Sequence, residues 1–263
     1  MKKAINLYFY GGDTKTKLDA IKSAGYDGVL LGMYTDTETM NITEQLEYCK
    51  NINLEVSMIH CQYNPELLNN FWDKDNEIAD EILNDFINQV ESISGFGVKN
   101  FVVHLSGTKT PKTSIYGLER IKKLLDVCQK NNIRLCVENL EYPKHVDYIF
   151  RNINHPMLYF CYDSGHKNCF SKYSKIAKKY SKTLSATHIH DNFGSHDDHI
   201  ILGLGKTNLN ELASELSQSN CEFLSAEIKY KNSSMPMYEI LKLNLEKLNI
   251  LDEKIKQKRT LKI

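Results

Sequence analysis

The sequence predicts an α/β fold, a (β/α)₈ TIM barrel in a single domain, from three observations. Short apolar runs alternate along the chain with longer segments of helical period. The short runs are continuously hydrophobic, which is typical of parallel strands that are covered on both faces. Eight strand–helix units in 263 residues give about 33 residues per unit, and eight such units close into a barrel of about 250 residues. A doubly wound open sheet is the competing architecture.

The eight strands are expected in chain order at residues 4–9, 27–32, 54–60, 99–105, 133–139, 158–163, 184–190 and 222–228. The chain starts with two lysines before an apolar run, as a leader does, but Asn6 interrupts that run and it is short, so we interpret it as a strand. Apolar faces at helical spacing predict helices over 78–90 and 118–128, and a last helix around 240–248. No linker divides the chain, so residues 1–253 are expected to form one barrel, followed by a basic tail at 254–263 without packing periodicity.

Composition limits the partners of this chain. The 33 Lys and Arg residues balance 33 Asp and Glu residues, so the net charge of zero provides no overall field for nucleic acid or an anionic membrane. Only four of the basic residues are Arg, which leaves few side chains for bidentate phosphate binding. No segment approaches the roughly 20 apolar residues of a membrane span. The seven Cys residues include no CxxC pair and predict reduced thiols in a cytoplasmic protein.

Polar side chains that can bind a metal close the apolar runs of six consecutive strands, the third to the eighth. Glu138 and Asp163 are 25 residues apart, as are Asp163 and His188, so each step is one strand–helix–strand unit. In a parallel barrel these groups return to the same rim, the C-terminal face, where active sites are built. Charged groups inside a barrel mouth are costly unless they are paired or bind a metal. The candidates are His60, His104, Glu138, Asp163, His188 and Glu227, with His166 three residues after Asp163.

The residue types narrow the choice of metal. Carboxylates and imidazoles without thiolates favour Mn²⁺ or Zn²⁺, with Co²⁺ or Fe²⁺ as further candidates, and the His content disfavours Ca²⁺ and Mg²⁺. Cys61 and Cys161 are close to the candidate ligands in sequence, and we interpret both as packing residues.

Several motifs together resemble the xylose isomerase-like TIM-barrel superfamily, which holds sugar-phosphate isomerases and epimerases and endonuclease IV-type AP endonucleases. The resemblance covers essentially the whole chain in order and spacing. The motifs that carry it are Val137-Glu138-Asn139, Asp163-Ser164-Gly165-His166, His188-Ile189-His190-Asp191-Asn192, Asp197-Asp198-His199 with Gly203-Leu204-Gly205, and Ala226-Glu227.

The resemblance implies roles for particular residues. In the isomerases and epimerases, four positions hold one metal, and here they are occupied by Glu138, Asp163, His188 and Glu227. The two Glu residues also form the acid/base pair, and His166 matches a substrate-contacting His. In the AP endonucleases the site extends to three metals, and the possible additional metal or substrate ligands are His60, His104, His166, Asp197 and His199. Isomerase relatives often form dimers or tetramers, which implies a homo-oligomer.

Two functions therefore remain open, and other features favour one of them. Residues 61–65 depart from the extended segment that enters the DNA minor groove in the nucleases, and residues 139–143 replace their Gly-rich turn. Neutral charge and scarce Arg also disfavour a duplex-binding face. The sequence thus predicts a metal-dependent isomerase or epimerase of a small sugar or sugar phosphate, in which one Glu removes a proton and the other returns it through a metal-bound enediolate. The alternative is an endonuclease IV-like phosphodiesterase with a multi-metal site.

Several residues beside these motifs are expected outside the set of metal ligands. We expect His190 to be structural or to support a ligand, and Asp191 to orient a ligand imidazole. Trp72 either caps a substrate or packs within its loop. His145, His155 and His196 are expected at the surface.

Overall fold

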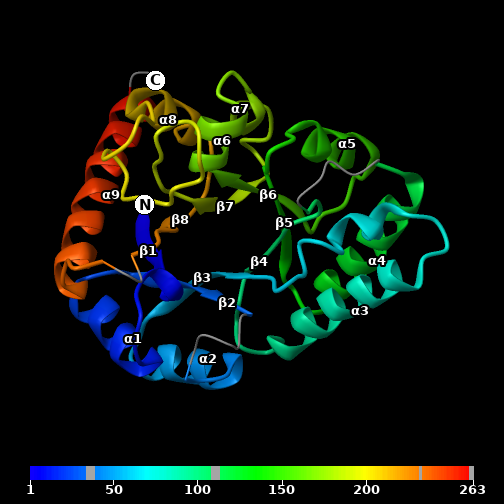
Figure 1. Cartoon of the computed structure of the whole chain (residues 1–263), viewed down its shortest axis with the longest axis horizontal. Helices are drawn as coiled ribbons and strands as arrows, with labels where there is room; N and C mark the ends of the chain where they lie inside the picture. The colour runs from blue at the N-terminus through cyan, green and yellow to red at the C-terminus, as the bar shows by residue number, and fades with distance from the viewer. Residues whose placement is uncertain (34–38, 108–112, 231–232, 261–263) are drawn as a thin grey trace.

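Eight parallel strands form a ring at the centre of the computed structural model, and helices cover the ring from outside (Figure 1). The structure describes residues 1–33, 39–107, 113–230 and 233–260. The strands are β1 (Lys2–Asn6), β2 (Gly28–Gly32), β3 (Glu55–His60), β4 (Asn100–Val103), β5 (Arg134–Glu138), β6 (Leu158–Asp163), β7 (Leu184–His188) and β8 (Phe223–Ala226). The predicted (β/α)₈ fold is confirmed, and each strand overlaps its expected range.

The helices lie between the strands in chain order. They are η1 (Leu7–Phe9), α1 (Thr14–Ser23), α2 (Ile42–Asn51), η2 (Leu68–Trp72), α3 (Glu77–Ser92), α4 (Ile115–Lys130), α5 (Lys144–Asn152), α6 (Ser164–Phe170), α7 (Ile176–Lys179), α8 (Leu209–Leu216) and α9 (Met237–Thr260). Local sequence explains where several begin. Asn41 and Glu44 form a capping box at the start of α2, and the carboxylate of Asp13 accepts the amide of Thr16 at the start of α1. Such caps each stabilise a helix by about 1 kcal/mol. No helix in the described ranges is long and apolar enough to cross a membrane.

The barrel closes between β7 and β8 with a contribution from a side chain. Neighbouring strands are paired in the order β7-β6-β5-β4-β3-β2-β1-β8. At the closing seam the amide of Ile189 donates to the carbonyl of Ser225 at 2.8 Å, and the amide of Glu227 donates to the carbonyl of Ile189 at 3.1 Å. Below these bonds, the hydroxyl of Thr187 donates to the carbonyl of Phe223 and accepts the amide of Ser225. The side chain of Thr187 thus replaces a backbone pairing at this seam.

The apolar core has two parts. The larger one fills the space between the outer face of the strands and the helices. The smaller one lies inside the barrel and consists of Leu30, Met58, Val102, Cys136, Cys161 and Ala186. Because side chains alternate along a strand, the residue two positions after an interior residue also faces inward. Cys136, Cys161 and Ala186 therefore place Glu138, Asp163 and His188 in the next interior layer, at the mouth.

The C-terminal segment packs against the barrel, contrary to the expected tail. Helix α9 continues past residue 253 to Thr260, and Ile255 on its inner face is fully buried. Asp252 explains this docking, because its carboxylate pairs with the N-terminal amino group at 2.9 Å and with the ammonium of Lys3 at 2.7 Å. The sequence boundary at 253 therefore does not separate the tail from the barrel. Residues 261–263 lie outside the described residues.

Candidate metal centre

Strand ends bring the predicted polar residues together at the C-terminal mouth. The imidazole Nδ1 of His188 lies 3.1 Å from Glu138 Oε1, 3.7 Å from Asp163 Oδ2 and 3.4 Å from Glu227 Oε2. All four side chains are buried. Among the described residues, Glu138 Oε1 and both ring nitrogens of His188 have no hydrogen-bond partner. Three buried carboxylates around one imidazole are costly without a compensating cation. These four residues therefore fit a divalent metal.

The turn after β6 is shaped by its own sequence. Asp163 ends the strand and caps α6, because its Oδ1 accepts the amide of His166 at 2.6 Å. Residue 165, two positions after Asp163, must be glycine, since a Cβ on Gly165 would lie 1.9 Å from Cε1 of the buried His190. The Asp-Ser-Gly-His motif thus directs Asp163 and His166 into the same site.

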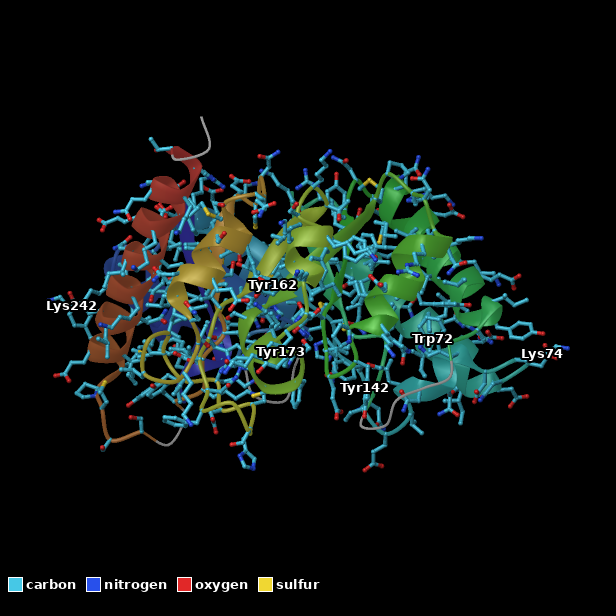
Figure 2. The ribbon with its side chains drawn as sticks, turned by 90° about the horizontal axis from the view of Figure 1, so that it is seen from above. Trp72, Lys74, Tyr142, Tyr162, Tyr173 and Lys242 are labelled. Atoms are coloured by element: carbon cyan, nitrogen blue, oxygen red, sulfur yellow. The ribbon has the colours of Figure 1, made fainter. Side chains whose placement is uncertain are left out.

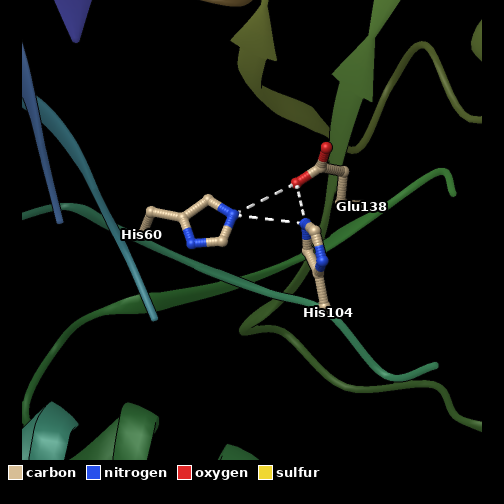
Figure 3. Close-up of side chains that lie close together, drawn as sticks. All are labelled: His60, His104 and Glu138. Carbon is tan, nitrogen blue, oxygen red and sulfur yellow. Dashed lines mark hydrogen bonds and ion pairs between the residues drawn. The ribbon is translucent and has the colours of Figure 1, made fainter. Parts of the chain in front are cut away.

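A second group of candidate ligands shares Glu138 with the first (Figure 3). Nε2 of His104 lies 2.9 Å from Glu138 Oε2 and 3.2 Å from Nε2 of His60. Nε2 of His60 is 3.6 Å from the same carboxylate oxygen. These three atoms are close enough to bind one cation.

A third group lies next to the first, since His166 Nδ1 is 3.2 Å from Glu138 Oε1. Asp197 Oδ2 is 2.8 Å from Nε2 of His199 and 3.4 Å from Nε2 of His166. His199 has a φ of +49°, in the left-handed region that is unusual for a residue with a side chain. Such conformations cluster at functional sites. All nine residues that the sequence singled out for metal or substrate therefore converge on one mouth.

Hydrogen bonds to backbone carbonyls fix the orientation of three imidazoles in the site. The Nδ1–H groups of His60, His166 and His199 donate to backbone carbonyls of Cys61, Asn139 and Glu227 at 2.8, 2.9 and 3.0 Å. With the proton held on Nδ1, the lone pair of Nε2 points into the site. An imidazole that donates its second nitrogen to a carbonyl is the usual arrangement of a metal-bound His.

Burial and neighbouring charges act against each other on the carboxylates. Burial raises the pKa of Glu138, but His188 and His104 outweigh burial and hold this pKa well below its usual value. Burial also raises the pKa of Glu227, and His188 and His199 again bring the net pKa below its usual value. Both carboxylates are therefore ionised at neutral pH, the state in which a carboxylate binds a cation or accepts a proton.

His190 supports the site from beside it. Its Nε2 lies 3.1 Å from Asp163 Oδ2, and its ring stacks on His199 with 4.1 Å between ring centres and 14° between planes. His190 therefore contacts both Asp163 and His199, and one of its ring nitrogens also lies within 4.8 Å of ligand atoms of His199 and Glu227. This arrangement agrees with the supporting role expected from the sequence.

Two tyrosines in the site were missed by the sequence analysis. The hydroxyl of Tyr8 donates to Glu227 Oε1 at 2.6 Å, and the hydroxyl of Tyr63 bonds to Nδ1 of His104. Tyr8 lies in η1, which directly follows β1, and Tyr63 lies in the segment after β3. Their position after a strand was the available signal, the same one that identified the candidate ligands.

The structure decides between the two roles expected for Trp72 and corrects the assignments of His145 and Asp191. Trp72 is buried within the helical layer, where its indole N–H donates to the carbonyl of Leu105 at 2.6 Å, so it packs and does not cap a substrate (Figure 2). His145 is also buried, with its ring against Trp72, and does not lie at the surface. The carboxylate of Asp191 accepts hydrogen bonds from backbone amides and, within the described residues, orients no imidazole.

Asp191 instead organises the loop that carries Asp197 and His199. Its fully buried carboxylate accepts the amides of Asn192, Gly203, Gly205 and Thr207 at 2.8 to 3.0 Å. Gly205 permits this approach, because a Cβ there would lie 2.5 Å from Asp191 Oδ1.

Asp191→Asn is expected to loosen this loop and to weaken zinc binding by about tenfold, the loss typical of an outer-shell partner. The side-chain amide of Asn has only one oxygen that can accept hydrogen bonds. Two of the four backbone amides therefore lose their acceptor, at a cost of roughly 3 kcal/mol. Hydrogen exchange over residues 192–207 and zinc titration measure both effects. Asp198→Asn is the matched control, because Asp198 accepts one amide, that of Phe193. Equal protection of this loop in the two variants would contradict the assigned role.

Comparison with known proteins agrees with this geometry. A family model described as xylose isomerase-like TIM barrel matches residues 18–252. An uncharacterised protein of Methanocaldococcus jannaschii, MJ1311, is 25% identical over 221 residues, which is 82% of this chain and 64% of that protein. The chain spans 48% to 64% of the length of the curated relatives that it matches.

Solved structures share the fold at low sequence identity. An L-ribulose 3-epimerase superposes with a TM-score of 0.80 at 12% identity, covering 99% of this chain and 97% of the epimerase. The IOLI protein, whose crystal structure has a bound zinc atom, gives a TM-score of 0.79 at 16% identity and covers 97% of this chain and 99% of its own. At these identities the likeness establishes the fold, and the function has to be argued from the site.

Proposed function

We propose, from the premise that this chain belongs to the xylose isomerase-like TIM barrel family, that it is a divalent-metal-dependent isomerase or epimerase of a small sugar or sugar phosphate. One observation carries the proposal. Glu138 and Glu227 approach the same imidazole nitrogen of His188 from different strands, at 3.1 and 3.4 Å, so two ionised carboxylates face one small volume. Two such bases are what a proton transfer between neighbouring carbons, or between two faces of one carbon, requires.

The residues that would hold the metal are Glu138, Asp163, His188 and Glu227. A divalent metal bound there supplies a positive charge that stabilises the negative charge developing on the substrate oxygens. Mn²⁺ and Zn²⁺ suit this set of oxygen and nitrogen ligands, as Co²⁺ and Fe²⁺ do. The zinc atom in the crystal structure of the IOLI protein, which shares this fold, supports a divalent cation for this chain.

Proton transfer falls to the two glutamates. One carboxylate removes the proton from the carbon next to the substrate carbonyl, and the other returns a proton to the opposite face or to the adjacent carbon. A carboxylate can hold the metal with one oxygen and move a proton with the other. Tyr8 helps to separate these tasks, because its hydroxyl donates to Oε1 of Glu227 while Oε2 faces His188.

A second candidate function is favoured by the additional ligands. The His60–His104–Glu138 group and the His166–Asp197–His199 group provide more donors than one cation can use. A site with several metals is typical of phosphodiester hydrolysis, in which two ions stabilise the attacking and leaving oxygens. The alternative is therefore a phosphodiesterase of the AP-endonuclease kind.

Counting metals and assaying both reactions separates the two candidates. The isomerase proposal expects one tightly bound ion per chain and incorporation of solvent deuterium into a ketose or its phosphate. The double variant His60→Ala with His104→Ala should keep that tightly bound ion and a measurable, though lower, exchange rate, because His104 contacts the carboxylate of Glu138. Three ions per chain, together with nicking of abasic duplex DNA that the same double variant abolishes, would establish the alternative and reject the isomerase.

A further inference from the structure

A buried cysteine lies directly beneath the proposed metal ligands. Cys161 faces the interior of the barrel on β6, two residues before Asp163, and it is paired in register with Glu138 on β5. The thiol sulfur, a carboxylate oxygen of Glu138 and a ring nitrogen of His188 all lie within 4.8 Å of one another. All three side chains are almost completely buried. An ion placed among these atoms would reach a sulfur as well as an oxygen and a nitrogen.

The two neighbours of this thiol are themselves short of partners. Oε1 of Glu138 and both ring nitrogens of His188 are buried and make no hydrogen bond to any residue in the described ranges. Two other buried thiols, in contrast, make hydrogen bonds of their own. The thiol of Cys136 donates to Asn100 Oδ1 at 3.7 Å, and the thiol of Cys221 donates to the carbonyl of Ser185 at 3.3 Å. Among the described residues, Cys161 is also the one cysteine whose sulfur lies close enough to other candidate ligands to share a cation with them.

We propose that Cys161 is a ligand of the bound metal, together with Glu138 and His188, and that its sulfur makes the site prefer Zn²⁺, Co²⁺ or Cd²⁺ to Mn²⁺. Binding forms a metal–sulfur bond, and the thiol proton is released to solvent, with no change of oxidation state. Soft thiolate ligands favour zinc and related cations, whereas carboxylates suit manganese. The inference rests on the metal-binding part of the proposed function and is independent of the substrate.

A bound divalent cation deprotonates a coordinating thiol outright. A metal–thiolate signal is therefore expected in the metal-loaded protein and not in the metal-free protein.

Cobalt substitution tests the proposal directly. The wild-type protein, stripped of metal and reloaded with Co²⁺, is expected to show the near-ultraviolet charge-transfer band of a sulfur–cobalt bond. Cys161→Ser should lose this band. Cys136→Ser should keep it, since Cys136 is also interior, on the neighbouring strand, and lies one layer below Glu138. Absence of the band in cobalt-loaded wild-type protein would overturn the proposal even if neither variant folds.

Metal affinities provide a second readout. Cys161→Ser is expected to weaken Zn²⁺ binding by at least about tenfold, the loss that removal of an outer-shell partner alone causes. Its affinity for Mn²⁺ should change little, so the ratio of the two affinities falls. If both affinities fall equally, the serine has disturbed the site as a whole and the ligand assignment is rejected. A sulfur–cobalt band in a protein without sugar isomerase activity would sustain this inference and refute the proposed function, while activity without the band would do the reverse.

Discussion

Glu227→Gln is expected to lower the rate of deuterium exchange into the substrate by roughly 10²- to 10⁴-fold, the range over which a positioned acid or base accelerates proton transfer. Glu138→Gln should have a similar effect. Gln keeps the shape of the side chain but has no ionisable oxygen, so it can neither take nor return the proton. The measurement is the exchange rate at saturating metal, with the metal content of each variant determined by elemental analysis.

Glu222→Gln is the matched control for this prediction. Glu222 directly precedes β8, whereas Glu227 directly follows it, so the two residues lie at opposite ends of the same strand. Glu222 pairs with the exposed Lys2 and Lys99, and such surface pairs contribute little to stability. The rate of deuterium exchange in the Glu222→Gln variant should equal that of the wild type. A fully metal-loaded Glu138 or Glu227 variant with a normal rate would refute the acid/base assignment.

Removal of the metal is expected to lower the thermal midpoint of unfolding by roughly 10 °C. A ligand at a thousand times its Kd stabilises the folded state by about 4 kcal/mol, and each kcal/mol corresponds to about 2–4 °C in a chain of this size. The physical reason is the buried charge, since Glu138, Asp163 and Glu227 lose the cation that compensates their burial. Differential scanning calorimetry with and without a chelator measures the shift.

His188→Ala serves as the control for the chelation experiment. His188 Nδ1 is within 3.7 Å of all three carboxylates, so its removal should abolish tight binding and leave a midpoint that the chelator does not change. Unchanged midpoints in the wild-type protein after verified metal removal would exclude a structural contribution of the metal.

Most of the fold and of the candidate site could be predicted from the strands and from the residues at their ends. The apolar runs located all eight strands, because buried parallel strands need continuous hydrophobic sequence and the pattern is local. The equal spacing of Glu138, Asp163 and His188 then placed these residues at the same rim, since each repeat returns the chain to that rim. The first strand was displaced, with β1 at Lys2–Asn6, because the side chain of Asn6 bonds to the backbone of Ile228 and the chain turns into η1.

Partners from distant parts of the chain could not be predicted in this way. The role of Asp191 depends on amides up to 16 residues away that only the folded loop brings to it. The packing of α9 depends on Asp252 meeting the N-terminal amino group, 251 residues away in sequence. The difference between packing and ligation for Cys161 depends on the register of β5 against β6.

The sequence by itself determined the eightfold repeat, the residues at the mouth and the chemical type of the ligands, because these follow from periodicity and from the identity of each strand's last residue. Only the tertiary structure decided which ligands share a position, which nitrogen each imidazole turns inward and which thiol lies under the carboxylates. Those properties depend on the stagger between neighbouring strands and on hydrogen bonds across the barrel, and neither is encoded in any single segment of the chain.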